Sequence, residues 1–318
     1  MNRAAATSSD RPDWLRRYGL IVALGTVCGT LAVLKPTFFS AANLVNIVRQ
    51  VSINGLLAVG VTLVLLTGGV DLSLGSVVAL AGVVAASLAQ PGDGPVILAI
   101  AAGIGAGLAC GLINGAVITS GGVAPFIATL GMMTAARGLA LVWSSGRPVS
   151  NLQPAFTRLG GDLGGVPIPT LILAGVAAAA WAALVWTPWG RHVYAVGSSE
   201  AAARVAGVRV ARVKLAAYGL CGALAGLAGV VLAARITTGQ PNAGIAYELD
   251  AIAAVVIGGT SLSGGVGGVG GTILGVLLLG VINSGLDQLN VSAYYQQIIK
   301  GVIIVGAVWL DRRARRES

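Results

Sequence analysis

The chain has 318 residues, of which 56 % are apolar and 10 % are charged, and its net charge is +9. Soluble domains carry about 25 % charged residues. This composition, with a mean hydropathy of +0.87, therefore excludes a soluble protein and predicts an all-α polytopic membrane protein in a lipid bilayer. The positive charge does not predict nucleic-acid binding, because thirteen of the twenty Lys and Arg fall in the segments 1–17, 191–214 and 312–316. Such clustering is typical of cytoplasmic segments.

Ten apolar segments qualify as membrane spans if short helices broken inside the protein are included. With the N-terminus in the cytoplasm, ten crossings bring all three basic clusters to that side, and eight longer spans would do the same. We therefore expect a cytoplasmic N-terminal tail at 1–17, a transmembrane domain at 18–310 with a cytoplasmic loop at 188–212, and a basic cytoplasmic tail at 311–318. The ten segments are 18–34, 51–67, 72–89, 95–118, 124–144, 168–187, 213–234, 248–260, 268–286 and 295–310.

The segment GGVDLSLGS at 68–76 places an acidic residue between two apolar runs. A charge at hydrocarbon depth costs at least ~2.5 kcal/mol, so Asp71 needs an explanation. In one interpretation, Asp71 caps the next helix at the cytoplasmic surface and satisfies its free N–H groups. In the other, the turn is re-entrant and lies on a translocation path, where irregular backbone is tolerated if protein or water surrounds it. The sequence favours the first interpretation and leaves both open.

Two pairs of segments suggest an internal repeat. GGVDLS at 68–73 is similar to GGTSLS at 258–263, and GLING at 111–115 is similar to GVINS at 280–284. The two offsets differ, so the pairs do not share one register. Inverted repeats are common in transporters, and here the pattern is only suggestive.

Further polar residues lie inside the predicted spans. Asn54 and Asn114 could donate hydrogen bonds to a polar solute, although amides that link two helices are commoner. Asn283 is a third amide of this kind. Arg137 lies thirteen residues after Ala124; such an arginine faces the bundle interior, a carbonyl or water, or it snorkels to the near interface.

Two loops are expected on the outer side. The segment 145–167 is rich in Pro and Gly, which predicts an ordered connection or a short interfacial helix. The segment 235–247 follows the seventh span and lies on the same side.

Enzyme chemistry has little support in the chain. His192 is the single histidine, and none of the three lysines follows a GxxxxGK[ST] segment, so the chain cannot hydrolyse ATP through that loop. GVGGVG at 265–270 matches GxGxxG, but a dinucleotide fold needs alternating strands and helices around it. Small residues that let helices approach closely explain this segment better. We expect no metal and no cofactor in this chain.

The loop 188–212 contains SSEAAARVAG, a segment with the signals of a two-turn helix. Ser198 or Ser199 can cap it, Glu200 complements the N-terminal dipole, and Gly207 can take the left-handed exit. The helix could be a solvated connection without a role. It could also be a rigid contact for a soluble partner, because the chain has no other long cytoplasmic loop.

Four stretches carry a resemblance that covers about a third of the residues. They are GLLAVGVTLVLLTGGVDLSLGSVVAL (55–80), GGVAPFIATLGMMTAARGLALVWSSGRP (121–148), GRHVYAVGSSEAAARVAGVRVARVK (190–214) and ELDAIAAVVIGGTSLSGGVGGVGGTILG (248–275). In order and spacing they resemble the permease subunits of bacterial ABC importers for simple sugars, of the ribose, xylose and arabinose type.

The resemblance implies a multi-pass protein of the bacterial inner membrane and a set of partners. It implies a homodimer with a second permease copy, a tandem-cassette ATPase subunit that binds ATP and Mg, and a periplasmic sugar-binding protein. The family's coupling helix maps onto Ser198, Ser199, Glu200, Ala203, Arg204 and Gly207. Ser199 departs from the Asn that is frequent there. The residues that we assign to the substrate path are Asn54, Asp71, Ser73, Asn114, Arg137 and Asn283.

The mechanism we expect is alternating access, in which the ATPase moves the helix at 198–207 and the spans tilt. A permease for branched-chain amino acids or another small polar solute is the first alternative. An ion-coupled secondary transporter is the second. It would need a carboxylate at the substrate site, whereas Asp71, Glu248, Asp250 and Asp287 lie near predicted span ends.

Overall fold

The computed structural model describes residues 13–316. Residues 1–12 of the predicted N-terminal tail and 317–318 of the predicted C-terminal tail lie outside this part. Every predicted span contains a helix. These helices are α1 (Asp13–Leu34), α2 (Ala41–Leu66), α3 (Leu74–Ser87), α4 (Val96–Thr119), α5 (Pro125–Trp143), α7 (Ile168–Trp186), α10 (Val210–Ile236), α11 (Tyr247–Ile257), α12 (Val269–Gln288) and α13 (Ala293–Arg316).

Six of the described helices, namely α2, α4, α5, α7, α10 and α12, are long and apolar enough to cross a membrane. By contrast α3 has 14 residues and α11 has 11. At 1.5 Å per residue these two are about 21 Å and about 17 Å long, less than the ~30 Å hydrocarbon core. The chain is therefore a helical polytopic membrane protein in which at least two apolar helices are short and adjoin irregular backbone.

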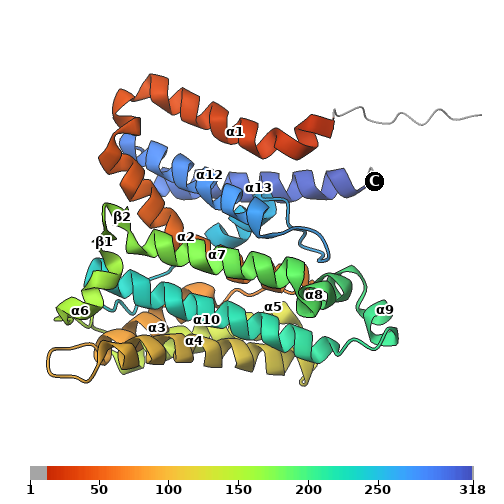
Figure 1. Ribbon diagram of the computed structural model, residues 1–318, viewed down its shortest axis with the longest axis horizontal. Helices are drawn as coiled ribbons and strands as arrows, with labels where there is room; N and C mark the ends of the chain where they lie inside the picture. The colour runs from red at the N-terminus through yellow and green to blue at the C-terminus, as the bar shows by residue number, and fades with distance from the viewer. Residues whose placement is uncertain (1–12, 317–318) are drawn as a thin grey trace, which may run out of the picture.

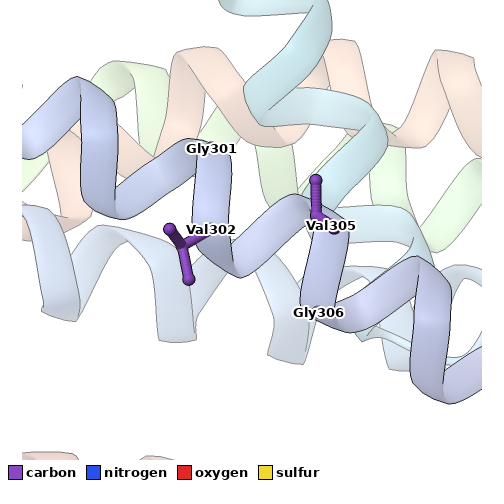
Figure 2. Close-up of a pocket in the computed structure, with 4 residues that line it drawn as sticks. All are labelled: Gly301, Val302, Val305 and Gly306. Carbon is purple, nitrogen blue, oxygen red and sulfur yellow. The ribbon is translucent and has the colours of Figure 1, made fainter.

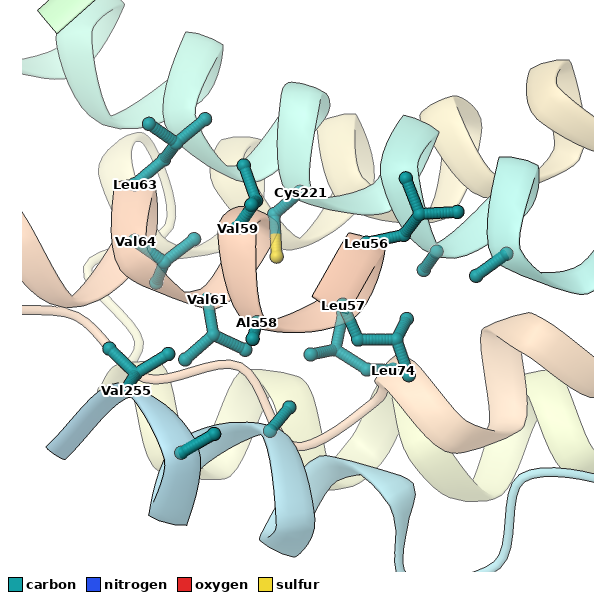
Figure 3. Packing of buried hydrophobic residues seen from close by; sticks show 14 of the residues in the cluster. Leu56, Leu57, Ala58, Val59, Val61, Leu63, Val64, Leu74, Cys221 and Val255 are labelled. Atoms are coloured by element: carbon teal, nitrogen blue, oxygen red, sulfur yellow. The ribbon is translucent and has the colours of Figure 1, made fainter. Parts of the chain in front are cut away.

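Helix α2 is the centre of the bundle. From Leu56 to Leu66 every one of its residues is buried, so the helix is covered by protein on all sides, as a helix that is apolar all round must be. Figure 3 shows its side chains packed between Cys221 of α10, Leu74 of α3 and Val255 of α11. The short helices α3 and α11 are therefore held against the fully buried second half of α2.

Helices α4 and α10 approach backbone to backbone. A Cβ atom on Gly107 would collide with the carbonyl oxygen of Gly222, and one on Gly111 would collide with that of Tyr218. Gly107 and Gly111 belong to a run of glycines at every fourth position of α4, 103, 107, 111 and 115. Small residues at this spacing let membrane helices pack closely, since lipid supplies no hydrophobic force between them.

The connections gather at two ends of the molecule (Figure 1). One end carries α6 (Pro154–Thr157), the turn η2 (Arg158–Gly160) and a hairpin of β1 (Asp162–Leu163) and β2 (Val166–Pro167). The expected ordered connection at 145–167 is thus confirmed. The opposite end carries α8 (Pro188–Ser198) and α9 (Glu200–Val205), and α1 begins and α13 ends there. The turn η1 (Pro36–Phe39) joins α1 to α2.

Candidate functional site

The first helix break, at 67–73, is a buried turn built around Asp71. The backbone N–H of Ser73 donates to Asp71 Oδ1 over 2.9 Å, and the Ser73 hydroxyl donates to the same oxygen over 2.6 Å. Asn114 Nδ2 of α4 donates to Ser73 Oγ over 3.1 Å. The structure therefore brings together three residues of the expected substrate path: Asp71, Ser73 and Asn114.

The interpretation of Asp71 as a helix cap at the surface is wrong, whereas its place on a translocation path stays a prediction. Asp71 is 1 % exposed, so it does not lie at a surface of this subunit, and the residue that precedes α3 as its N-cap is Ser73. Asp71 stabilises the N–H of that capping residue instead. Helix α10 closes the turn, because the Tyr218 hydroxyl donates to the carbonyl oxygen of Val70 over 3.1 Å. The irregular backbone is thus surrounded by protein, as membrane burial requires.

The second break, at 258–268, repeats this local geometry. The backbone N–H of Ser263 donates to Ser261 Oγ over 3.0 Å, which is the contact that Ser73 makes with Asp71 190 positions earlier. Ser261 is fully buried. The two breaks also touch, because the N–H of Gly265 donates to the carbonyl oxygen of Leu66 over 3.0 Å. The similarity of GGVDLS and GGTSLS therefore reflects a shared turn at adjoining positions.

A third irregular segment, 237–246, supplies the hydrogen-bond partners of Arg137. This side chain donates from Nη1 to the carbonyl oxygens of Pro241 and Ala243, over 2.7 Å and 2.8 Å. The sequence analysis left the bundle interior, a carbonyl, water and the near interface open for Arg137, and the structure shows hydrogen bonds to backbone carbonyls. These oxygens have no helical partner, and a carbonyl left unpaired away from water is costly. Gly244 of the same segment lies against Gly75 in the first turn of α3.

Asn54 and Asn283 lie apart from the Asp71 turn. Asn54 is twelve residues before the end of α2, about 18 Å along the helix axis. Asn283 is buried five residues before the end of α12. The hydroxyl of its neighbour Ser284 donates a hydrogen bond to Asn43 Oδ1 in the first turn of α2 over 3.0 Å. The six residues of the expected path therefore fall into one hydrogen-bonded group, one backbone tether and two separate amides.

Helix α9 has the boundaries that its capping signals predict. The Ser199 side chain accepts from the N–H of Ala202 over 3.2 Å, and Gly207 has a φ of +82°. The Glu200 carboxylate accepts from Lys214 Nζ of α10 over 2.6 Å and also pairs with Arg204. The hydrogen bond from Lys214 lowers the pKa of Glu200, and the positive charge of Arg204 adds to this. Ion pairing therefore holds α9 against the start of α10.

The two faces of α9 differ. Ala203 is 4 % exposed and packs into the main core, whereas Val205 is 91 % exposed. Ala203, which the resemblance includes in the coupling helix, therefore anchors it from inside. Val205 belongs to the exposed face and was missed, because no local signal marks which side of a two-turn helix faces outward.

Helix α8 was also missed by sequence reasoning, which treated 188–197 as loop. Thr187 caps it by accepting from the N–H of Gly190 over 3.2 Å, and Pro188 occupies its first turn. Both are helix-start signals. Val193 and Val196 are buried while Arg191 and His192 are exposed, so α8 is an amphipathic surface helix that hydropathy alone does not detect.

Two hollows of different character lie on the described surface. One has a volume of about 260 Å³ and is lined mainly by polar groups between α4, α9 and α10, including Thr119, Glu200, Arg204 and Lys214. The other, about 440 Å³, runs along α13 beside Gly301, Val302, Val305 and Gly306 (Figure 2). This second hollow offers no polar side chain and suits lipid or another apolar helix. Among residues 13–316 no cluster of His, Cys, Asp and Glu could hold a metal ion.

Short apolar helices that end in buried turns inside a helical bundle are the architecture of membrane transporters. The family described as "branched-chain amino acid transport system / permease component" matches residues 43–308. The chain belongs to this family.

Similar proteins extend over nearly the whole chain. The ribose import permease protein RbsC of Escherichia coli strain K12 is 46 % identical over 305 residues, which cover 94 % of this chain and 95 % of that protein. RbsC of Bacillus subtilis is also 46 % identical, with 94 % of each chain covered. The galactose/methyl galactoside import permease protein MglC of Salmonella typhimurium is 37 % identical, again over 94 % of each. No solved structure matches the chain. The resemblance to simple-sugar permeases is confirmed.

Proposed function

We infer that the chain is the membrane-spanning permease subunit of an ABC importer that admits a monosaccharide. The observation that carries this inference is similarity along the full length to permeases for ribose, galactose and arabinose. These sugar permeases favour a sugar over a branched-chain amino acid, although the family description names the latter. The chain is a transport component rather than an enzyme, and a separate ATPase subunit binds ATP and Mg.

The docking element for that ATPase, in this proposal, is α9 with Ser198, Ser199, Glu200, Ala203, Arg204 and Gly207. Two features support it. The helix exposes Val205 and Arg204, and the Glu200–Lys214 pair with the buried Ala203 fixes it to the bundle. A helix that is anchored on one face and exposed on the other can transmit the movement of a soluble partner to the bundle.

The proposed topology has ten crossings with both termini in the cytoplasm, tails at 1–17 and 311–318, and the loop 188–212 between them. The start of α1, the end of α13 and α9 lie at one end of the bundle (Figure 1), which supports this orientation. The periplasmic binding protein would then dock at the other end. There Val149 and Gly239 pair the loop 145–167 with the segment after α10.

The substrate path, in this proposal, uses Asn54, Asp71, Ser73, Asn114, Arg137 and Asn283 at different depths. Asp71, Ser73 and Asn114 are buried within this subunit, so the helices around them must move apart before a sugar can reach them. Asp71 and Asn114 sit beside a helix break, and irregular backbone at membrane depth is where transporters place polar contacts. The amides and carboxylate suit sugar hydroxyls. A weak, transient interaction is expected, because the binding protein holds the affinity and the path must release what it admits.

The test reconstitutes the chain in proteoliposomes with a tandem-cassette ATPase subunit and a sugar-binding protein from the same organism. We expect ATP-dependent uptake of a labelled pentose or hexose, competed by that sugar and not by leucine. Competition by leucine would favour the amino-acid alternative. Uptake that survives ATP depletion but collapses with the ion gradient would favour a secondary transporter and refute the proposal.

A further inference from the structure

The C-terminal end of α8 sits on both buried breaks. A Cβ atom on Gly197 would collide with the carbonyl oxygen of Leu66, at the end of α2, and would approach the N–H nitrogen of Gly265. Gly265 in turn donates its N–H to that same Leu66 oxygen over 3.0 Å. Backbone from three segments thus meets without intervening side chains. We call Leu66, Gly197 and Gly265 the three-way junction.

The junction explains the glycine-rich segment that follows α11. Gly265 has a φ of +73°, and a Cβ atom there would lie 2.6 Å from Ser198 Oγ. A side chain is therefore excluded twice, by backbone conformation and by α8. The first glycine of the GVGGVG segment thus lets the end of α8 contact the loop backbone directly. This role is more specific than the close helix packing that the sequence suggested.

A side-chain hydrogen bond joins α8 to the same loop. The hydroxyl of Tyr194 donates to the carbonyl oxygen of Gly267 over 3.0 Å. Burial raises the pKa of this hydroxyl, so it stays a donor at neutral pH. Helix α9 follows α8 after one residue, Ser199, and a displacement of α9 must therefore be accommodated by α8 and its contacts.

From the junction, short covalent paths lead to both turns. Asp71 lies five residues after Leu66, and Ser261 lies four residues before Gly265. Leu66 is the last residue of α2, and Ser261 follows α11 by four residues. A shift of α8 at the junction therefore acts on both turns at once, and through them on the two short helices α3 and α11.

We propose that the three-way junction transmits motion of α8 and α9 to the Asp71 and Ser261 turns, and that Tyr194 is a positioning residue for this coupling. The proposal rests on the function inferred above, in which α9 receives the push of the ATPase. The proposal names the contact inside the permease through which a displacement of α9 reaches the membrane helices.

The test compares Tyr194→Phe with wild type in the reconstituted full importer. Tyr294→Phe is the matched control, because Tyr294 is 82 % exposed on α13. Three quantities are measured: co-purification with the ATPase, ATP hydrolysis stimulated by the loaded binding protein, and sugar transported per ATP. In Tyr194→Phe we expect normal co-purification and hydrolysis, with sugar per ATP lowered roughly fivefold, the effect of losing one ordinary hydrogen bond on an equilibrium. Tyr294→Phe should match wild type.

An unchanged sugar-to-ATP ratio in Tyr194→Phe would overturn the proposal. Lost co-purification in that variant would also overturn it, because Tyr194 would then be structural. A second variant, Gly197→Ala, inserts a methyl group into the junction, with Gly175→Ala as control because a Cβ there meets nothing within 4 Å. A wild-type ratio in Gly197→Ala would contradict the junction. If the wild-type chain neither binds the ATPase nor transports sugar, the proposed function fails instead.

Discussion

Arg137→Ala is the substitution whose effect follows most directly from the structure. The guanidinium donates to the carbonyl oxygens of Pro241 and Ala243, and hydrogen bonds from a charged group are worth about 1.5–3 kcal/mol each. Arg137 is half-buried, so water can replace part of the lost contact. We therefore expect the free energy of opening the segment 237–246 to fall by about 2–3 kcal/mol, below the sum of two full bonds.

Hydrogen exchange measures this opening. A change of 2–3 kcal/mol corresponds to about 30- to 150-fold faster exchange. It should be confined to backbone amides of 237–246, including that of Ala243, which donates to the Gln240 carbonyl oxygen. The chain in lipid nanodiscs is the sample. Arg147→Ala, at an exposed arginine in the loop 145–167, is the control and should leave exchange unchanged. Wild-type exchange of 237–246 in Arg137→Ala would refute the tether and favour a snorkelling side chain.

Three further predictions concern α9 and the helix contacts. Glu200→Lys and Lys214→Glu should each lower stimulated ATP hydrolysis about twofold to fivefold, the range for a partly exposed ion pair, and the double swap should recover most of it; failure of the swap would mean that Glu200 acts on the ATPase rather than on α10. Gly107→Val should lower the stability of the detergent-solubilised chain by about 1–3 kcal/mol through overpacking against α10, whereas Gly105→Val, where a Cβ meets nothing within 4 Å, should not; equal thermal inactivation of the two would contradict the close contact. Because the folded-state pKa of Glu200 lies below its ordinary value of 4.5, its stabilisation of α9 is present above that value and is lost as the pH falls through the folded-state pKa; protease sensitivity of α9 should therefore stay constant over the neutral range and rise only in acid, and a rise near neutrality would contradict this reasoning.

The helices could be predicted from the sequence because hydropathy reports burial in lipid or protein alike. Hydropathy did not separate the short helix α3 from a full span, since the predicted span 72–89 is one apolar run, whereas the predicted span 248–260 that contains α11 was already short. Helix α8 was missed because its polar face lowers its hydropathy. The start of α9 was found because Ser199 and Glu200 act within their own turn.

The candidate site could be predicted only where its contacts are local. The bond between Ser73 and Asp71 spans two residues and is visible in the pattern DLS. The addition of Asn114 depends on how α4 is rotated against α3, which no local pattern fixes. The partners of Arg137 are backbone carbonyls. Every residue has a carbonyl, so the sequence does not mark which ones an arginine will contact. Asn54 and Asn283 were grouped with these residues by polarity alone, and the fold separates them.

The central claim is that α9 faces the cytoplasm and receives the ATPase. Val205→Cys places a thiol at a side chain of α9 that is 91 % exposed. The unsubstituted chain is the control for labelling of the three natural cysteines. A membrane-impermeant maleimide should label Val205→Cys in inside-out vesicles only, and bound ATPase subunit should protect it. Labelling in right-side-out vesicles would contradict both the orientation and the docking site.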